Sequence, residues 1–146
     1  NISYKGKYGK DHRPIMIHRA LMGSLERFFG ILIEHYAGNF PLWLAPIQVS
    51  ILTIADRHKY FAFELLKRFQ SEGIRSKIDF ENEKISYKIR RATLMKIPYL
   101  IIIGDKEVSQ NKITIRKRNG ENIELISQDE FLETIKNQIK SKTINI

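Results

Sequence analysis

The seven residues Ile97–Ile103 restrict the possible folds of this chain most strongly, because none of them is charged. A strand this apolar has no face that suits water, and such strands occur in parallel sheets that helices cover on both sides. Gly104–Glu107 follow directly. Ligands of open α/β sheets collect at the carboxyl ends of the strands, so these four residues are candidates for a binding site.

Predicted strands and helices alternate on both sides of this strand in the sequence. Beyond Pro46, strand-like runs alternate with runs whose apolar residues recur at helical spacing. Asn119–Gly120 predicts a hairpin turn, and Ser127 with Glu130 forms a capping box that opens a helix. The order β-α-β-α-β-β-(β)-α predicts an α/β fold with a mixed, mainly parallel central sheet of about five strands and helices on both faces. We expect strands at 47–55, 75–80, 97–103, 112–118 and 123–126, and helices after Asp56, Asn82 and Ser127.

A strand followed by a helix is also predicted near the N-terminus. Pro14 fixes its own φ, and Ile15–His18 suit a strand. Apolar residues then fall at helical spacing from Leu25 onward. Ser24 and Arg27 stand at the helix N-terminus, where an Arg fork and exposed N–H groups can hold an anionic ligand. An ordinary amphipathic helix capped by Ser24 explains the same residues.

Composition narrows the class of protein. The 146 residues suffice for one full core with a small appendage, and no run approaches the roughly 18 apolar residues that cross a bilayer. The N-terminus lacks a signal pattern, so we expect a cytoplasmic protein. There is no cysteine, and the net charge of +9 favours a polyanionic partner, nucleic acid before an acidic membrane.

Two elements concentrate this charge. The helix after Asn82, for which Asn82 is the expected N-cap, has no acidic residue between Lys84 and Lys96. A solvated helix face is the ordinary explanation, but unpaired like charges destabilise a helix unless an anionic partner offsets them. One face of the strand 112–118 carries Lys112, Thr114, Arg116 and Arg118, and a row of cations on a strand is a platform suited to single-stranded RNA.

Several separated motifs carry a family resemblance. They are His18–Ala20, Gly23–Arg27, Phe40–Val49, Asn82–Ile85 and Gly104–Glu107. Together they resemble class II aminoacyl-tRNA synthetases, with the stretch Pro14–Gly38 as motif 3, and the threonyl family in particular. The resemblance implies that residues 1–40 end a catalytic domain, as a strand and a helix, and that 41–146 form an anticodon-binding domain.

The resemblance also implies roles for single residues. Asn82, Glu107 and Arg116 would read anticodon bases, because Asn offers both a donor and an acceptor, Glu accepts N–H groups and Arg grips a guanine edge. Without the resemblance, they are a helix cap, a loop charge and a solvated cation. The residues expected to hold tRNA phosphates are Lys84, Lys88 and Arg90.

In a whole enzyme of this family, threonine is activated with ATP and transferred to the tRNA 3′ end. Arg27 would be catalytic and bind ATP, Ser24 would lie against the adenylate, and His18 would supply one of three zinc ligands. The family is homodimeric, and this chain alone is expected to bind RNA, hold no cofactor and catalyse nothing. Two alternatives remain: another synthetase of the subclass (prolyl, glycyl or histidyl) and a non-enzymatic nucleic-acid-binding module with the same fold.

Overall fold

The computed structural model describes residues 2–144, which fall into two compact units that divide between Leu32 and Ile33. In the first unit, β1 (Tyr4–Lys5) and β2 (Asp11–His12) form an antiparallel hairpin. The strand predicted at Ile15–His18 is wrong: the segment joins no sheet. A strand needs a neighbour for its backbone hydrogen bonds, and residues 2–144 provide none for this segment.

The helix predicted after it is confirmed as α1 (Leu25–Tyr36). The Ser24 hydroxyl accepts a hydrogen bond from the Arg27 N–H at 3.3 Å, as an N-cap does. The helix ends where Ala37 and Gly38 adopt φ values of 47° and 73°. The Gly38 N–H donates back to the Ile33 carbonyl at 2.9 Å, a common way of closing a helix.

The second unit is built on a five-stranded sheet in the order β4-β3-β5-β6-β7. Both β4 and β5 pair parallel with β3, whereas β6 and β7 extend the sheet antiparallel. The predicted mixed sheet is therefore confirmed, with a larger antiparallel part than a mainly parallel sheet would have. The strands are β3 (Val49–Thr53), β4 (Ser76–Asp79), β5 (Tyr99–Ile103), β6 (Lys112–Lys117) and β7 (Asn122–Ser127).

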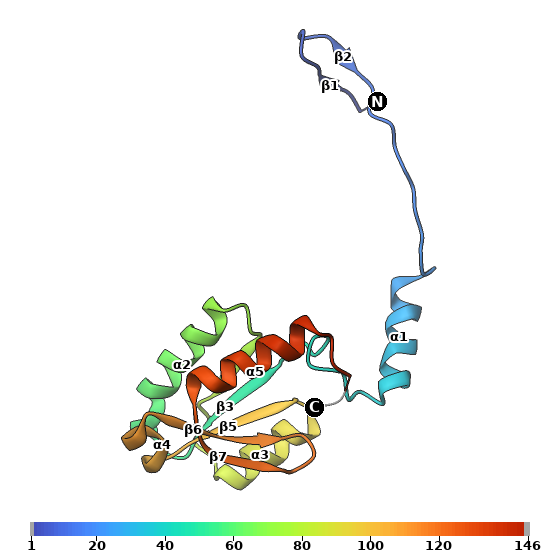
Figure 1. The fold of residues 1–146 in the computed structure, drawn as a ribbon. Helices are drawn as coiled ribbons and strands as arrows, with labels where there is room; N and C mark the ends of the chain where they lie inside the picture. Colours follow the sequence, from blue (N-terminus) through green and yellow to red (C-terminus); the bar gives the residue numbers. More distant parts are fainter. Residues whose placement is uncertain (1, 145–146) are drawn as a thin grey trace. The chain divides into compact units, whose positions relative to one another are not determined.

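Helices cover both faces of this sheet, as predicted (Figure 1). Apolar side chains of α2 and α5 pack on one face in the larger core cluster, and Ala92 of α3 packs with Leu52 and Leu100 on the other. The helices are η1 (Asp56–His58), α2 (Lys59–Ser71), α3 (Ile85–Leu94), α4 (Asp105–Gln110) and α5 (Gln128–Lys140). None of those in residues 2–144 has the length and apolar character to span a membrane.

Local signals predicted the helix ends with mixed success. The capping box before α5 is confirmed, because the Ser127 hydroxyl accepts from the Glu130 N–H at 3.1 Å. Asn82 is not the N-cap of α3: the helix begins at Ile85, and Lys84 occupies the cap position. The chain thus leaves β4 through an exposed segment before α3 starts, and Asn82 lies in that segment.

Candidate nucleic-acid interface

One strand presents different chemistry on its two faces. Ile113 and Ile115 of β6 are fully buried in the core beneath α2 and α5. Thr114 and Arg116 point to the opposite, α3 side and are half-buried, opposite Ile102 and Leu100 of β5. The Arg116 Nη1 donates to the Asn122 Oδ1 at 3.0 Å, so β7 steadies the guanidinium.

Glu107 reaches this face from α4. Its Oε2 accepts from the Gly104 N–H at 2.9 Å, and its Oε1 accepts from the Thr114 hydroxyl at 2.7 Å. Burial raises the pKa of Glu107, but these hydrogen bonds outweigh it and hold the pKa below its ordinary value. The side chain is therefore an anionic acceptor at neutral pH.

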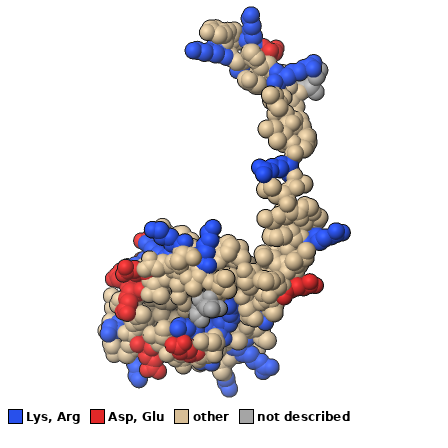
Figure 2. All heavy atoms as spheres, turned by 45° about the vertical axis from the view of Figure 1, so that its right-hand side comes forward, with Lys and Arg blue, Asp and Glu red and all other residues tan. Residues whose placement is uncertain are grey.

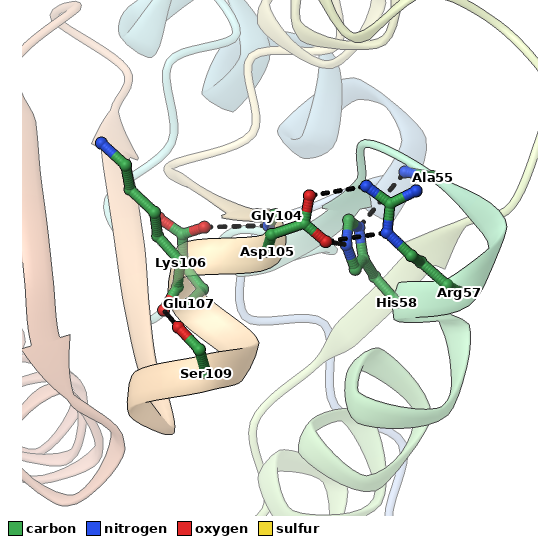
Figure 3. Close-up of polar contacts among 8 residues, drawn as sticks. All are labelled: Ala55, Arg57, His58, Gly104, Asp105, Lys106, Glu107 and Ser109. Carbon is green, nitrogen blue, oxygen red and sulfur yellow. Dashed lines mark hydrogen bonds and ion pairs between the residues drawn. The ribbon is translucent and has the colours of Figure 1, made fainter.

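A second polar cluster holds the start of α4 (Figure 3). Arg57 donates to both carboxylate oxygens of Asp105, at 2.7 and 2.6 Å. The buried His58 ring accepts from the Ala55 N–H at Nδ1, so its Nε2 carries the proton and donates to Asp105 at 2.9 Å. The hydrogen bonds from Arg57 and His58 hold the pKa of Asp105 well below its ordinary range. This cluster ties α4 to the end of β3.

Asn82 lies in the segment between β4 and α3, which Asp79 and Arg91 anchor. The Asp79 carboxylate accepts from the Glu81 N–H at 3.1 Å and pairs with Arg91, which also pairs with Glu81. Burial raises the pKa of Asp79, but the Arg91 and Glu81 hydrogen bonds outweigh it and leave that pKa lowered. The Asn82 side chain is exposed and has no hydrogen-bond partner within residues 2–144.

The expected phosphate contact at Lys88 is wrong. Its side chain is 3% exposed, and its ammonium points inward, donating to the carbonyl oxygens of Thr53 at 3.1 Å and Asp79 at 3.5 Å. The sequence held a signal for this placement, because Lys88 follows Ile85 by three residues and precedes Ala92 by four. That spacing places Lys88 on the apolar stripe of α3.

The other two expected phosphate contacts remain available. Lys84 and Arg90 are exposed, and neither forms an ion pair with any residue in 2–144. Figure 2 shows that Lys and Arg lie among Asp and Glu on the surface of the second unit. The overall charge therefore does not by itself mark a nucleic-acid surface. The exposed positions of Lys84 and Arg90 around α3 are the more specific sign of one.

Topology brings the three predicted base readers to one side of the sheet. The parallel strands β4 and β5 end at the same edge of the sheet and are two strand spacings, or roughly 10 Å, apart. Asn82 follows the end of β4 by three residues, and Glu107 follows the end of β5 by four. Thr114 joins Glu107 to β6, and Arg116 lies two residues further along the same face. The sequence interpretation had missed Thr114 as a contact of Glu107, and also the Arg57–His58–Asp105 cluster.

The residues expected to serve catalysis lie in the first unit. Ser24 donates to Glu26 at 2.6 Å, which lowers the Glu26 pKa, and Arg27 and His18 are exposed. Nothing in residues 2–144 groups three or more His, Asp or Glu side chains at metal-binding distance. His18 alone does not make a zinc site, so the residues of this chain do not fit that metal by themselves.

Known proteins resemble this chain in sequence. The sequence profile of the family described as "Anticodon binding domain" matches residues 48–138. Threonine–tRNA ligase from Desulforamulus reducens is 51% identical over 144 residues, which are 99% of this chain and 23% of that protein. The enzyme of the same name from Thermotoga maritima is 48% identical over 146 residues, again 23% of its length. The chain thus spans about a quarter of these relatives.

Solved structures agree. The RNA-binding domain of threonyl-tRNA synthetase from Cryptosporidium parvum superposes with a TM-score of 0.75 at 29% identity, over 93% of this chain and 34% of that one. Histidyl-tRNA synthetase from a Nostoc species gives a TM-score of 0.60 at 20% identity, over 64% of this chain and 23% of that one, which shows a shared fold only. The resemblance seen in the sequence motifs is confirmed.

Proposed function

The chain belongs to the family of anticodon-binding domains, and on that premise we propose that the α3 side of its sheet binds the anticodon loop of a threonine tRNA. The observation that carries the proposal is that the Thr114 contact holds Glu107 beside the face of β6 that also carries Arg116, with Asn82 at the same edge of the sheet as Glu107. Unpaired bases present donors and acceptors along their edges. A fixed carboxylate, a guanidinium and a free amide together complement such edges.

Cations near α3 serve a different purpose in this proposal. Lys84 and Arg90 hold phosphates, which position the RNA without reading its sequence. Lys88 has no such role, because its ammonium is buried in hydrogen bonds to backbone carbonyls. Affinity therefore depends on salt through Lys84 and Arg90, and selectivity depends on the side chains at the sheet edge.

For the whole protein we propose a cytoplasmic, homodimeric threonine–tRNA ligase that activates threonine with ATP. Relatives of that name, about 50% identical over nearly the whole chain, favour threonine over the other amino acids of the subclass. Residues 1–40 would close its catalytic domain, with Arg27 and Ser24 at the ATP, and residues 41–146 would bind the anticodon. His18 would supply one zinc ligand there; this chain has no cysteine to offer as another.

The test compares two RNAs that differ only in the anticodon. The 146-residue chain is titrated with a labelled threonine-tRNA anticodon stem-loop and with the same loop carrying a changed anticodon, at near-physiological salt. Asn82→Ala and Arg116→Ala are each expected to weaken binding of the matched loop by about 1–3 kcal/mol and to weaken binding of the altered loop much less. Arg68→Ala, on α2 across the sheet, is the matched control and leaves both affinities unchanged.

Phosphate contacts give a different result. Each of the variants Lys84→Ala and Arg90→Ala should weaken binding of both loops to the same extent. Each should also reduce the slope of log affinity against log salt by about one. If the unaltered chain binds both loops equally, the base-reading proposal fails. The chain is then a basic module without sequence preference, which is the non-enzymatic alternative.

A further inference from the structure

The hydroxyl of Thr114 is oriented from two sides. It donates to the Glu107 Oε1 at 2.7 Å and accepts from the Leu125 N–H at 3.5 Å. Leu125 has a φ of 53° and lies on β7 where the register with β6 shifts, so that Glu124 and Leu125 together face Thr114. Such a bulge redirects backbone groups. Here it turns an N–H toward a lone pair of Thr114, which leaves the hydroxyl hydrogen for Glu107.

The carboxylate of Glu107 is thereby held at both oxygens. The Gly104 N–H holds Oε2 at 2.9 Å, and Thr114 holds Oε1. Each oxygen of an ionised carboxylate accepts about two hydrogen bonds, so each keeps one acceptor site free. Without the Thr114 contact, Oε1 would lose its side-chain hydrogen bond, and the carboxylate would be freer to rotate about its last side-chain bond.

Resting on the function proposed above, we propose that Thr114 is a positioning residue for base recognition. Its hydroxyl fixes the carboxylate of Glu107 in the orientation that accepts N–H groups from the edge of an unpaired base. A β-branched side chain on a strand has few χ1 choices, which suits this task. Val has nearly the same shape without the hydroxyl, and Ser keeps the hydroxyl, so the two replacements separate shape from hydrogen bonding.

The experiment is a double-mutant cycle on the 146-residue chain. Thr114→Val, Glu107→Gln and the double variant are titrated with the threonine-tRNA anticodon stem-loop and with loops in which each anticodon base is replaced in turn. Loss of one hydrogen bond predicts about fivefold weaker binding of the matched loop by Thr114→Val. Thr114→Val should hardly change the affinity for the altered loop that lacks the N–H donors read by Glu107. Thr114→Ser should bind the matched loop as tightly as the unaltered chain does.

The coupling between the two substitutions shows whether Thr114 acts on RNA binding through Glu107. In the Glu107→Gln background, adding Thr114→Val should weaken the matched loop by no more than about twofold, because the group that Thr114 positions is already impaired. Thr134→Val removes an exposed hydroxyl on α5 and serves as the matched control, with unchanged binding. Thermal unfolding of each variant checks that the fold is retained.

Each outcome is decisive. The proposal is overturned if Thr114→Val weakens every loop alike, if the two losses multiply in the double variant, or if Thr114→Ser fails to restore binding. An unaltered chain that prefers the matched loop, together with any of these results, leaves the proposed function standing and removes only the role of Thr114. An unaltered chain without preference removes both.

Discussion

The segments that carry Asn82 and Glu107 follow strands that end at the same edge of the sheet, yet they are held in opposite ways. At Glu107 the side chain itself is fixed, by the Gly104 N–H and the Thr114 hydroxyl. At Asn82 the neighbouring backbone is fixed, through Asp79 and Arg91, and the side chain is left without a partner in the described chain.

The difference has a consequence for recognition. A side chain held before the ligand arrives loses little conformational freedom on binding, so Glu107 can discriminate strictly. A free amide pays for its ordering when it binds, but it can present either its donor or its acceptor to a base. The two residues would thus combine one rigid contact with one adaptable contact at the same sheet edge.

The largest effect is expected from removing Asp79, whose carboxylate fixes the backbone next to Asn82. Asp79→Ala should lower the free energy of unfolding by about 2–3 kcal/mol, because it removes charged hydrogen bonds and an anion that interacts with the buried Lys88 ammonium. Urea unfolding at neutral pH measures it. Asp129→Ala removes an exposed carboxylate paired with Arg68 and should cost no more than about 1 kcal/mol. Equal losses would contradict a structural role for Asp79.

A middle-sized effect depends on pH. The folded-state pKa of Glu107 is lowered from 4.5, so its carboxylate stabilises the fold above that pH, and the contribution is lost as the pH falls through the folded-state pKa. Glu107→Gln should therefore cost about 1 kcal/mol at pH 7 and progressively less in acid. Unfolding curves between pH 7 and pH 3 test this; a difference that stays constant would show that the charge does not matter.

The smallest effect is expected at Asn82. Asn82→Ala should change the free energy of unfolding by less than about 0.5 kcal/mol, because the exposed side chain has no partner to lose in the described structure. The same variant should still weaken RNA binding. A large stability loss would instead mean that the side chain supports the fold, and the contrast with Glu107 would disappear.

Much of the fold followed from local patterns. The apolar run before Gly104 became the central strand β5, and Ser127 with Glu130 opened α5 as its capping box predicted. Predictions that depended on a partner element fared worse. The segment Ile15–His18 has strand-like residues but joins no sheet, because strand composition does not supply a neighbouring strand.

The sequence by itself determined most strands and helices of the second unit, because periodicity and capping act over a few residues. The family resemblance marked Asn82, Glu107 and Arg116. Only the tertiary structure decided that the Lys88 ammonium meets the Thr53 carbonyl and that Thr114 holds Glu107. It also joined His58 to Asp105, residues 47 apart in the chain. Such contacts depend on strand order and register, which bring distant residues within hydrogen-bond reach and leave no periodic trace in the sequence.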